Sequence, residues 1–161
     1  MPPEAPSAGL PVQGPAREDV RVLPSLKQRF PLLMVDKVLS WEKWRELRAV
    51  KNITVNEIYF QGHFPGYPIF PGALTIECFA QASALLISLS RDEPLAPGMF
   101  DAIGTVLDFR FLKPIFPGDR LETHVTLTKR AGTNRMFEGK CYVDNEEAAS
   151  GKLIIAEIRL P

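Results

Sequence analysis

The sequence predicts an α+β protein in which a curved antiparallel sheet wraps around one central helix. Three observations lead to this class. A long apolar segment at 72–90 follows a loop rich in proline and glycine. Two segments rich in β-forming residues precede it, and about four follow it with short turns between them. Short connections favour antiparallel neighbours, because parallel strands need long crossovers.

The chain has 161 residues, 45% of them hydrophobic, which suits a single domain with a sizeable core. Residues 1–22 are rich in Pro, Ala and Gly, so we expect a disordered tail there and one domain at 23–161. The tail lacks the apolar core and basic start of a secretion signal. The longest apolar run, near 82–87, is too short to cross a bilayer, so we expect no membrane insertion.

The first elements form a predicted hairpin. Segments 32–41 and 46–53 are rich in apolar and β-forming residues, and the short stretch "EKWR" between them is typical of a turn. Thr54 and Glu57 then have the Thr-x-x-Glu spacing of a capping box, which predicts a short helix at about 55–60.

The central helix is predicted at 72–90. Pro71 and Gly72 mark its start, where the missing N–H of proline would have no partner in any case. From Ala73 to Ser90 the helix is apolar on nearly every side, which predicts that it is buried. The polar stretch "RDEPLAPG" ends it.

The rest of the chain has the pattern of strands separated by short turns, at 100–115, 120–130, 134–144 and 149–160. The second of these strands alternates between two faces, one of which carries Leu121, Thr123, Val125 and Leu127. His124 falls on the opposite face, and we expect it to be exposed and to take no part in the chemistry.

Charge and cysteine content narrow the function classes. Basic and acidic residues each number 19, so the chain has no overall basic character that would indicate a nucleic-acid partner. Its two cysteines, Cys78 and Cys141, lie far apart without a CxxC spacing, which predicts neither a disulfide framework nor a zinc site. Two reduced, partly buried thiols are typical of a cytoplasmic protein.

Glu77 is the only charged residue between Gly72 and Arg91. Burial destabilises an ionised carboxylate, so a glutamate on a buried helix favours the neutral acid, which can donate a proton. The alternative is a glutamate that forms hydrogen bonds within the fold or lies at a subunit interface. Gln81 follows four residues later on the same helix face, where it could orient the carboxyl group or a water molecule.

His63 lies in a loop stiffened by Pro65, Pro68 and Pro71. A histidine titrates near neutral pH and suits a general base, and the prolines lower the entropy lost in holding it in one position. The alternative is a histidine whose ring is satisfied by local backbone groups. Gly72 opens the helix, where backbone N–H groups without internal partners could stabilise an oxyanion and a substrate could approach closely.

A base, an acid and oxyanion donors within one short segment indicate proton abstraction next to a carbonyl with loss of water, a chemistry that requires no cofactor or metal. A thioesterase-like hydrolase with Cys78 as nucleophile and His63 as base is less favoured, because Cys78 points about 100° away from Glu77 around the helix. A metal site built from His63 and Glu77 lacks a third ligand of suitable spacing.

The segment "HFPGYPIFPGALTIECFAQ" resembles the active-site segment of the FabZ-type β-hydroxyacyl-[acyl-carrier-protein] dehydratases. The stretches "RFPLLMVDKV", "RAVKNITVNEIYFQGHFPG" and "FRFLKPIFPGD" resemble the same family in the same order, so the likeness covers roughly 23–160. By position, His63 and Glu77 match the catalytic pair, and Gly72 matches the glycine whose N–H faces the thioester carbonyl. The supporting residues that the motif supplies are Phe64, Pro65, Gly66 and Pro71.

The resemblance implies a hot-dog fold and dehydration of a (3R)-hydroxyacyl thioester on acyl carrier protein to the trans-2-enoyl thioester, in fatty acid or similar biosynthesis. It also implies a homodimer, commonly assembled as a trimer of dimers, in which the His and the Glu of one site come from opposite subunits. The Glu at position 77 favours this family over the related dehydratase-isomerases, which carry Asp there. The alternative is a non-catalytic hot-dog subunit that binds acyl thioesters, and the intact pair argues against it.

Two positions depart from the family's pattern. Gln28 precedes Arg29 where the family often has His-Arg, and Leu112 stands where a basic residue is common. Because neither belongs to the catalytic pair, we expect these departures to affect docking of the carrier protein or contacts between subunits, and not the reaction. The acidic carrier would need basic residues at the mouth of the site, and the Arg and Lys side chains near 110–130 are candidates.

Overall fold

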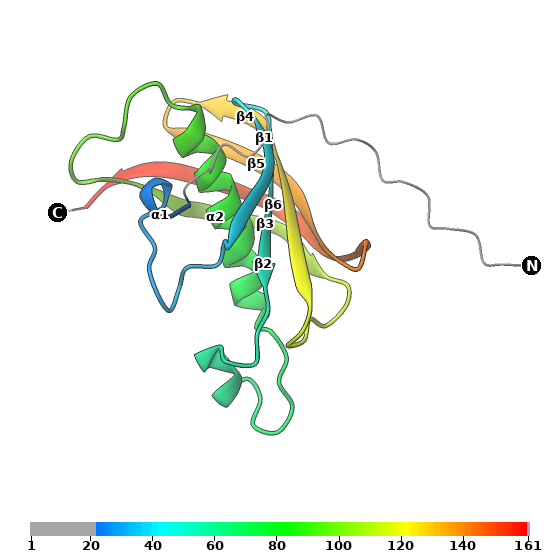
Figure 1. The fold of residues 1–161 in the computed structure, drawn as a ribbon. Coiled ribbons are helices and arrows are strands. Elements are labelled where there is room, and N and C mark those ends of the chain that lie inside the picture. The colour runs from blue at the N-terminus through cyan, green and yellow to red at the C-terminus, as the bar shows by residue number, and fades with distance from the viewer. Residues whose placement is uncertain (1–21, 161) are drawn as a thin grey trace, which may run out of the picture.

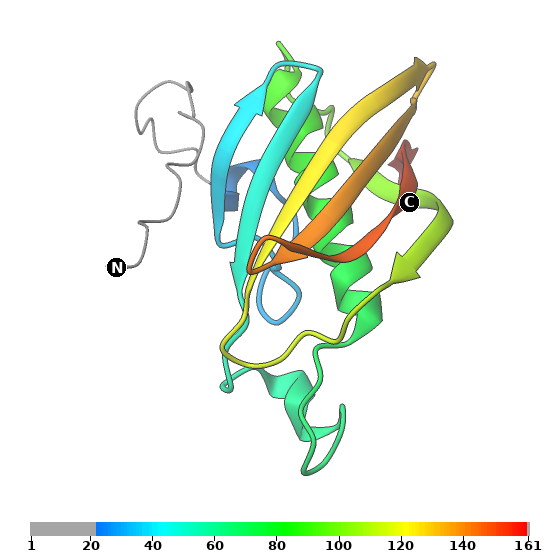
Figure 2. The same cartoon turned by 90° about the vertical axis from the view of Figure 1, so that its right-hand side faces the viewer.

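In the computed structural model, which describes residues 22–160, six antiparallel strands form one curved sheet around helix α2 (Gly72–Ser90) (Figure 1, Figure 2). The order across the sheet is β1-β2-β4-β5-β6-β3. The strands are β1 Lys37–Glu42, β2 Glu46–Asn52, β3 Met99–Phe111, β4 Arg120–Ala131, β5 Asn134–Val143 and β6 Glu146–Arg159. This architecture confirms the predicted α+β class. The predicted tail at 1–22 lies outside the described residues except for Val22, where helix α1 (Val22–Ser25) begins.

The core lies between α2 and the inner face of the sheet. Leu121, Thr123 and Val125 of β4 are buried, as the alternation along this strand predicts. Val125 packs in one cluster with Phe137 of β5 and Phe79 of α2, and all three side chains are almost completely removed from solvent. The sheet therefore holds α2 through side chains that the period-two pattern assigns to one face.

Helix α2 has the bounds that the sequence predicts, but it is not buried on every side. Ala73 is exposed, and Glu77, Ala84 and Ser88 are half-buried. Ala84 and Ser88 line a small cavity with residues of α1 and the segment that follows it. By length and composition alone, α2 is long and apolar enough to cross a bilayer, although 56% of its most apolar stretch is buried here, as in the core helix of a folded domain.

The predicted β1–β2 hairpin is confirmed, but β1 begins only at Lys37. The backbone of residues 32 and 34, in the segment before it, bonds to α2. The N–H of Met34 and the carbonyl of Leu32 both bond to the side chain of Gln81. Backbone pairing with β2 starts at the N–H of Asp36. The segment that precedes β1 thus holds a side chain of the central helix.

The predicted capping box at Thr54 and Glu57 is wrong. A short 3₁₀ helix, η1 (Ile58–Gln61), follows Glu57, but the Glu57 side chain makes no capping bond. Its Oε1 instead accepts a hydrogen bond from Lys51 Nζ at 2.7 Å. Low polarity in the interior strengthens the attraction between opposite charges, so the ion pair outcompetes the cap.

Strand β3 lies at one edge of the sheet and pairs only with β6 among the described strands. Its apolar side chains are open to solvent, with Ile103 and Val106 each 40% exposed. A long apolar edge presents unpaired backbone groups and is a site for pairing with another chain.

Candidate active site

The loop between η1 and α2 extends beyond one end of the sheet and carries His63 (Figure 1). The backbone N–H of His63 donates to Tyr59 O at 3.0 Å, and its Nδ1 lies 2.8 Å from Ile69 O. A carbonyl oxygen only accepts, so Nδ1 carries the proton and Nε2 keeps its lone pair. Local backbone groups therefore satisfy one ring nitrogen and leave the other able to take up a proton.

The residues after His63 build the turn that holds its ring. Phe64 stacks on the imidazole with the ring centroids 4.1 Å apart. Phe64 and Tyr67 exchange two backbone hydrogen bonds, of 3.1 and 2.9 Å, around Pro65 and Gly66. Gly66 has a φ of 77°, a conformation in which other residues are strained. The motif residues thus lie where they can hold the histidine in place.

Gly72 is the first residue of α2, directly after the N-cap Pro71. The first helical bonds to Pro71 O come from Leu74 (2.9 Å) and Thr75 (3.1 Å). The N–H groups of Gly72 and Ala73 therefore precede the helix's own ladder, at its positive end.

A cavity of about 360 Å³ brings His63 and Gly72 together. Its walls also include Thr75 of α2, Phe111 at the end of β3, and Leu112, which follows that strand. A Cβ atom at Gly72 would lie 2.9 Å from Cζ of Phe111, so glycine leaves room for that ring beside the helix start. The cavity therefore joins the His63 imidazole, the first residue of α2 and an apolar wall.

Glu77 does not line the cavity that contains His63 of the same chain. Glu77 belongs to the half-buried strip of α2, which we define as Glu77, Ala84 and Ser88. Its Oε1 accepts hydrogen bonds from Gln81 Nε2 at 2.7 Å and from Gln28 Nε2 at 3.4 Å. Within one protomer the structure thus brings His63 and Gly72 together and leaves Glu77 apart from them.

Gln81 is completely buried, and its amide has a fixed orientation. Its Oε1 accepts a hydrogen bond from Met34 N–H at 2.8 Å, so its Nε2 must donate, and it does so to Leu32 O at 2.6 Å and to Glu77 Oε1. Oε1 of Glu77 is therefore an acceptor, and Oε2 is the oxygen that can carry a transferable proton. The expectation that Gln81 could orient this carboxyl group agrees with these contacts.

The two departures from the family's pattern lie beside candidate site residues. The amide of Gln28 contacts the Glu77 carboxylate, and Leu112 lines the cavity of His63. The expectation that they affect docking or subunit contacts, and not the reaction, stays a prediction. The sequence carried no signal for the Gln28 contact, because it joins residues far apart in the chain.

Cys78 faces the core and is 2% exposed. Burial raises the pKa of its thiol well above the usual range, so the thiolate that a nucleophile requires is disfavoured. Burial also raises the pKa of Cys141 to about 12. These surroundings argue against the thioesterase-like alternative.

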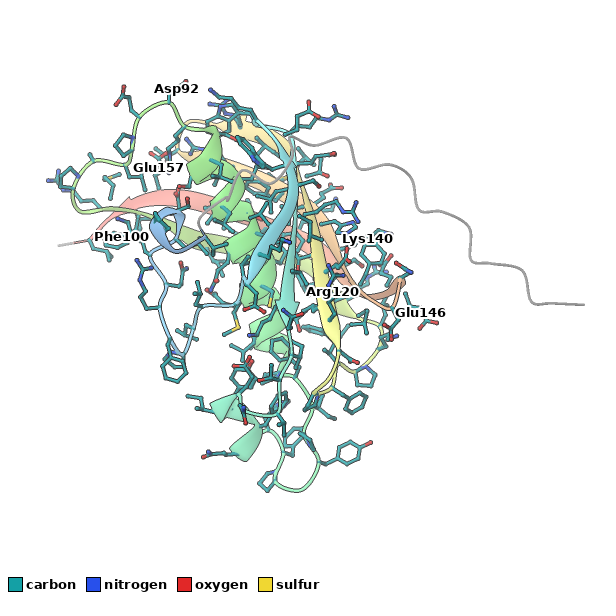
Figure 3. All side chains as sticks on the ribbon, in the orientation of Figure 1. Asp92, Phe100, Arg120, Lys140, Glu146 and Glu157 are labelled. Carbon is teal, nitrogen blue, oxygen red and sulfur yellow. The ribbon has the colours of Figure 1, made fainter. Side chains whose placement is uncertain are left out.

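His124 is half-buried on the outer face of the sheet, and not exposed as predicted. Its Nε2 accepts a hydrogen bond from Arg48 Nε at 3.1 Å and lies 3.3 Å from Glu122 Oε2. Burial lowers the pKa of His124, and the Arg48 charge adds to the effect. A hollow of about 680 Å³ lies on this outer face, where Figure 3 shows charged side chains such as Lys140 on the side away from α2. Neither His63 nor Glu77 lines it.

Gln81→Leu should lower the free energy of unfolding, because it leaves the buried Met34 N–H without its partner, at about 1–3 kcal/mol for an orphaned group, and also removes the bond to Leu32 O at the protein surface. Chemical denaturation at one fixed protein concentration measures the change. Ser83→Ala is the control, since within residues 22–160 Ser83 Oγ bonds only to Phe79 O of its own helix. Equal stability of Gln81→Leu and Ser83→Ala would contradict the anchoring role.

Comparison with known proteins places the chain in a family. A family model described as the FabA-like domain matches residues 26–152. The 3-hydroxyacyl-[acyl-carrier-protein] dehydratase FabZ of Blochmanniella floridana is 46% identical over 136 residues, which cover 84% of this chain and 89% of the relative. The FabZ protein of Escherichia coli O9:H4 (strain HS) is 44% identical over 139 residues, covering 86% of this chain and 91% of the relative.

Solved structures share the fold at low identity. The dehydratase heterocomplex ApeI:P from Xenorhabdus doucetiae aligns with a TM-score of 0.73 and 15% identity, over 86% of this chain and 91% of that chain. The E. coli PaaI protein aligns with a TM-score of 0.58 and 12% identity, over 74% of this chain and 80% of that chain. The wrapped helix and sheet are thus those of a hot-dog protein. The chain belongs to the FabA-like family, among the FabZ-type dehydratases.

Proposed function

We propose that this chain is a hydro-lyase that removes water from a (3R)-hydroxyacyl thioester on acyl carrier protein and yields the trans-2-enoyl thioester, in fatty acid or similar biosynthesis. His63 carries the proposal: Ile69 O holds its Nδ1, and the ring lines one cavity with the first residue of α2. Relatives at 44–46% identity bear the name of this dehydratase.

His63 acts as the base in the proposed reaction. Nε2 takes the C2 proton of the substrate, and the electron pair of that C–H bond moves toward the thioester carbonyl. The N–H groups at the start of α2 stabilise the negative charge that develops on the carbonyl oxygen, because they have no partners in the helix and lie at its positive end. The thioester fits this position because it acidifies the C2 proton.

Glu77 acts as the acid. Oε1 accepts from two amides, so the proton that Glu77 donates leaves from Oε2 and passes to the C3 hydroxyl, which departs as water while the C2–C3 double bond forms. Return of the C2 proton from His63 to Glu77 through solvent resets the site. Every bond change uses side chains or backbone groups of the protein.

The site requires a second copy of the chain. Glu77 lies outside the cavity of His63, and the exposed edge of β3 offers a surface for pairing. We therefore propose a homodimer in which His63 of one protomer meets Glu77 of its partner, with further assembly to a trimer of dimers. A cytoplasmic location agrees with two free, buried cysteines.

Val106→Lys should shift the protein toward monomers, because a charge on the apolar edge of β3 opposes pairing with a second sheet. Sedimentation or light scattering across protein concentrations measures the assembly state. Thr126→Lys adds the same charge at an exposed position of β4. Because β4 has a neighbouring strand on both sides, this variant should leave assembly unchanged. If both variants assemble like the wild type, β3 is not the interface.

The decisive experiment offers the purified chain a 3-hydroxyacyl thioester on acyl carrier protein. Rising absorbance of the conjugated enoyl thioester, without release of free thiol, is the expected result. Release of thiol would indicate a thioesterase, and acyl binding without turnover would indicate a non-catalytic subunit. Either outcome would overturn the proposed dehydratase.

A further inference from the structure

The ion pair between the buried Lys51 and the half-buried Glu57 has no part in the chemistry proposed above. Lys51 lies on β2 with 5% of its side chain exposed, and its Nζ lies 2.7 Å from Glu57 Oε1. Among residues 22–160, Lys51 is the only lysine that is buried. Strand alternation puts it on the same face as Leu47 and Ala49, which pack toward α2. An ammonium group is thus held inside the core.

Stability alone does not explain such a pair. Removing two charges from water offsets much of their mutual attraction, and well-packed apolar replacements for buried pairs are often neutral or stabilising. A charge-assisted hydrogen bond does offer a direction and a short, defined distance, which apolar contacts do not. The question is therefore what the pair holds in place.

Glu57 begins the turn that leads to His63. The carbonyl of Glu57 accepts the N–H of Phe60 at 3.2 Å. The carbonyl of Tyr59 then accepts the N–H groups of both Gly62 (3.2 Å) and His63 (3.0 Å). The carbonyl of Tyr59 and the N–H of Phe60 belong to the same peptide group. A connected series of hydrogen bonds thus joins the Lys51 ammonium on β2 to the backbone of His63, the proposed base.

Tyr59 packs the same turn against the core. Its ring meets Phe60 and Phe70 edge to face, with centroids 5.1 and 5.5 Å away. Its hydroxyl is buried and has no partner with hydrogen-bond geometry in the described part of the chain. Burial, and then the Glu57 carboxylate, raise the pKa of Tyr59, so this hydroxyl stays neutral. Among these groups, Lys51 is the one that neutralises Glu57.

We propose that Lys51 and Glu57 are positioning residues whose ion pair fixes η1 against β2 and thereby holds His63 at its working distance from the substrate. This inference rests on the proposed role of His63 as the base. A displacement of about 1 Å in a catalytic group lowers the rate by roughly 100-fold. The pair should therefore affect turnover even where it does not affect stability.

The test separates position from stability with a double variant. Glu57→Leu leaves the buried Lys51 ammonium unpaired, and Lys51→Met leaves the half-buried Glu57 carboxylate unpaired, so each single variant should melt earlier than the wild type, Glu57→Leu the more so. Lys51→Met/Glu57→Leu removes both charges and should recover most of the melting temperature. Its kcat should nevertheless stay about 10- to 100-fold below that of the wild type, with KM changed less than threefold or so.

A second readout does not depend on turnover. The chain has two histidines, so imidazole NMR signals are few, and the His63→Ala variant assigns them. The double variant should shift the His63 ring signals and leave those of His124 unchanged, because His124 lies on the outer face of the sheet. Lys152→Met/Glu138→Leu is the matched control: it removes an exposed ion pair, with 2.7 Å between Nζ and Oε1, that lines neither the cavity of His63 nor the turn before it, and it should retain both rate and signals.

The outcomes decide the proposal in each case. Wild-type kcat and unshifted His63 signals in the double variant would show that the pair has no positioning role. If the double variant does not fold, Glu57→Gln serves instead: it keeps the side-chain shape and a bond acceptor but loses the charge, and it should show a smaller loss of kcat with the same shift in the His63 signals. Unchanged kcat and signals in Glu57→Gln would overturn the proposal. A wild-type protein without dehydratase activity would refute the proposed function, whereas shifted His63 signals in the variants would still report the anchoring.

Discussion

Replacing His63 with alanine should lower kcat for dehydration by about 10²- to 10⁴-fold, the range that a general base contributes. The loss of rate follows from the loss of one atom, Nε2 of His63. Ile69 O occupies Nδ1, so Nε2 is the ring nitrogen that can take the C2 proton, and alanine offers no substitute for it. The rate is measured as the rise in absorbance of the conjugated enoyl thioester.

His124→Ala is the matched control for this experiment. It removes the other histidine of the chain, which bonds to Arg48 on the outer face of the sheet, and it should retain the rate of the wild type. Circular dichroism and melting curves of both variants exclude a loss through unfolding. A His63→Ala rate within a few-fold of the wild-type rate would contradict the assignment of His63 as the base.

The central helix and its start could be predicted from the sequence because local rules decide them. Pro71 has no N–H to lose and Gly72 has no side chain, so the helix begins there whatever surrounds it. The same holds for β4, where strict alternation of Leu121, Thr123 and Val125 indicates one buried face, and the structure confirms it. These features need no information from distant parts of the chain.

The two wrong local predictions, the capping box and the early start of β1, concern groups that bond to a residue distant in the sequence. Thr54 and Glu57 have the spacing of a capping box, yet Glu57 pairs with Lys51, whose burial on β2 no local pattern reveals. The segment before β1 is rich in β-forming residues, but Gln81 takes its backbone groups. Both cases are tertiary contacts that override a local preference.

In the candidate site too, local sequence predicts some contacts and not others. His63 and Gly72 lie in one short segment and meet in one cavity, as their proximity in the sequence suggests. Glu77 lies on that segment too, but the helix carries it away from the cavity, so sequence proximity alone would place it wrongly. The expectation that it serves the site of a partner subunit came from the family resemblance and remains a prediction.

Mixing two inactive variants should restore activity if His63 and Glu77 of one site come from different protomers. Glu77→Gln retains the shape of the side chain but has no transferable proton at the position of Oε2, so it should be nearly as inactive as His63→Ala. In a dimer of one His63→Ala and one Glu77→Gln chain, one site lacks both groups. The other site has an intact His63 from the second chain and an intact Glu77 from the first.

Refolding the two variants together in equal amounts makes half of the dimers mixed, each with one intact site, so the mixture should reach about a quarter of the wild-type rate. The matched control mixes His63→Ala with the Val106→Lys/Glu77→Gln double variant, in which the charge on β3 should hinder pairing and prevent the recovery. Activity no higher than the sum of the separate variants, in a mixture shown to contain mixed dimers, would place His63 and Glu77 of each site in one chain. The geometry predicts the opposite, because the half-buried strip of α2 presents Glu77 outside the cavity that His63 of its own chain lines.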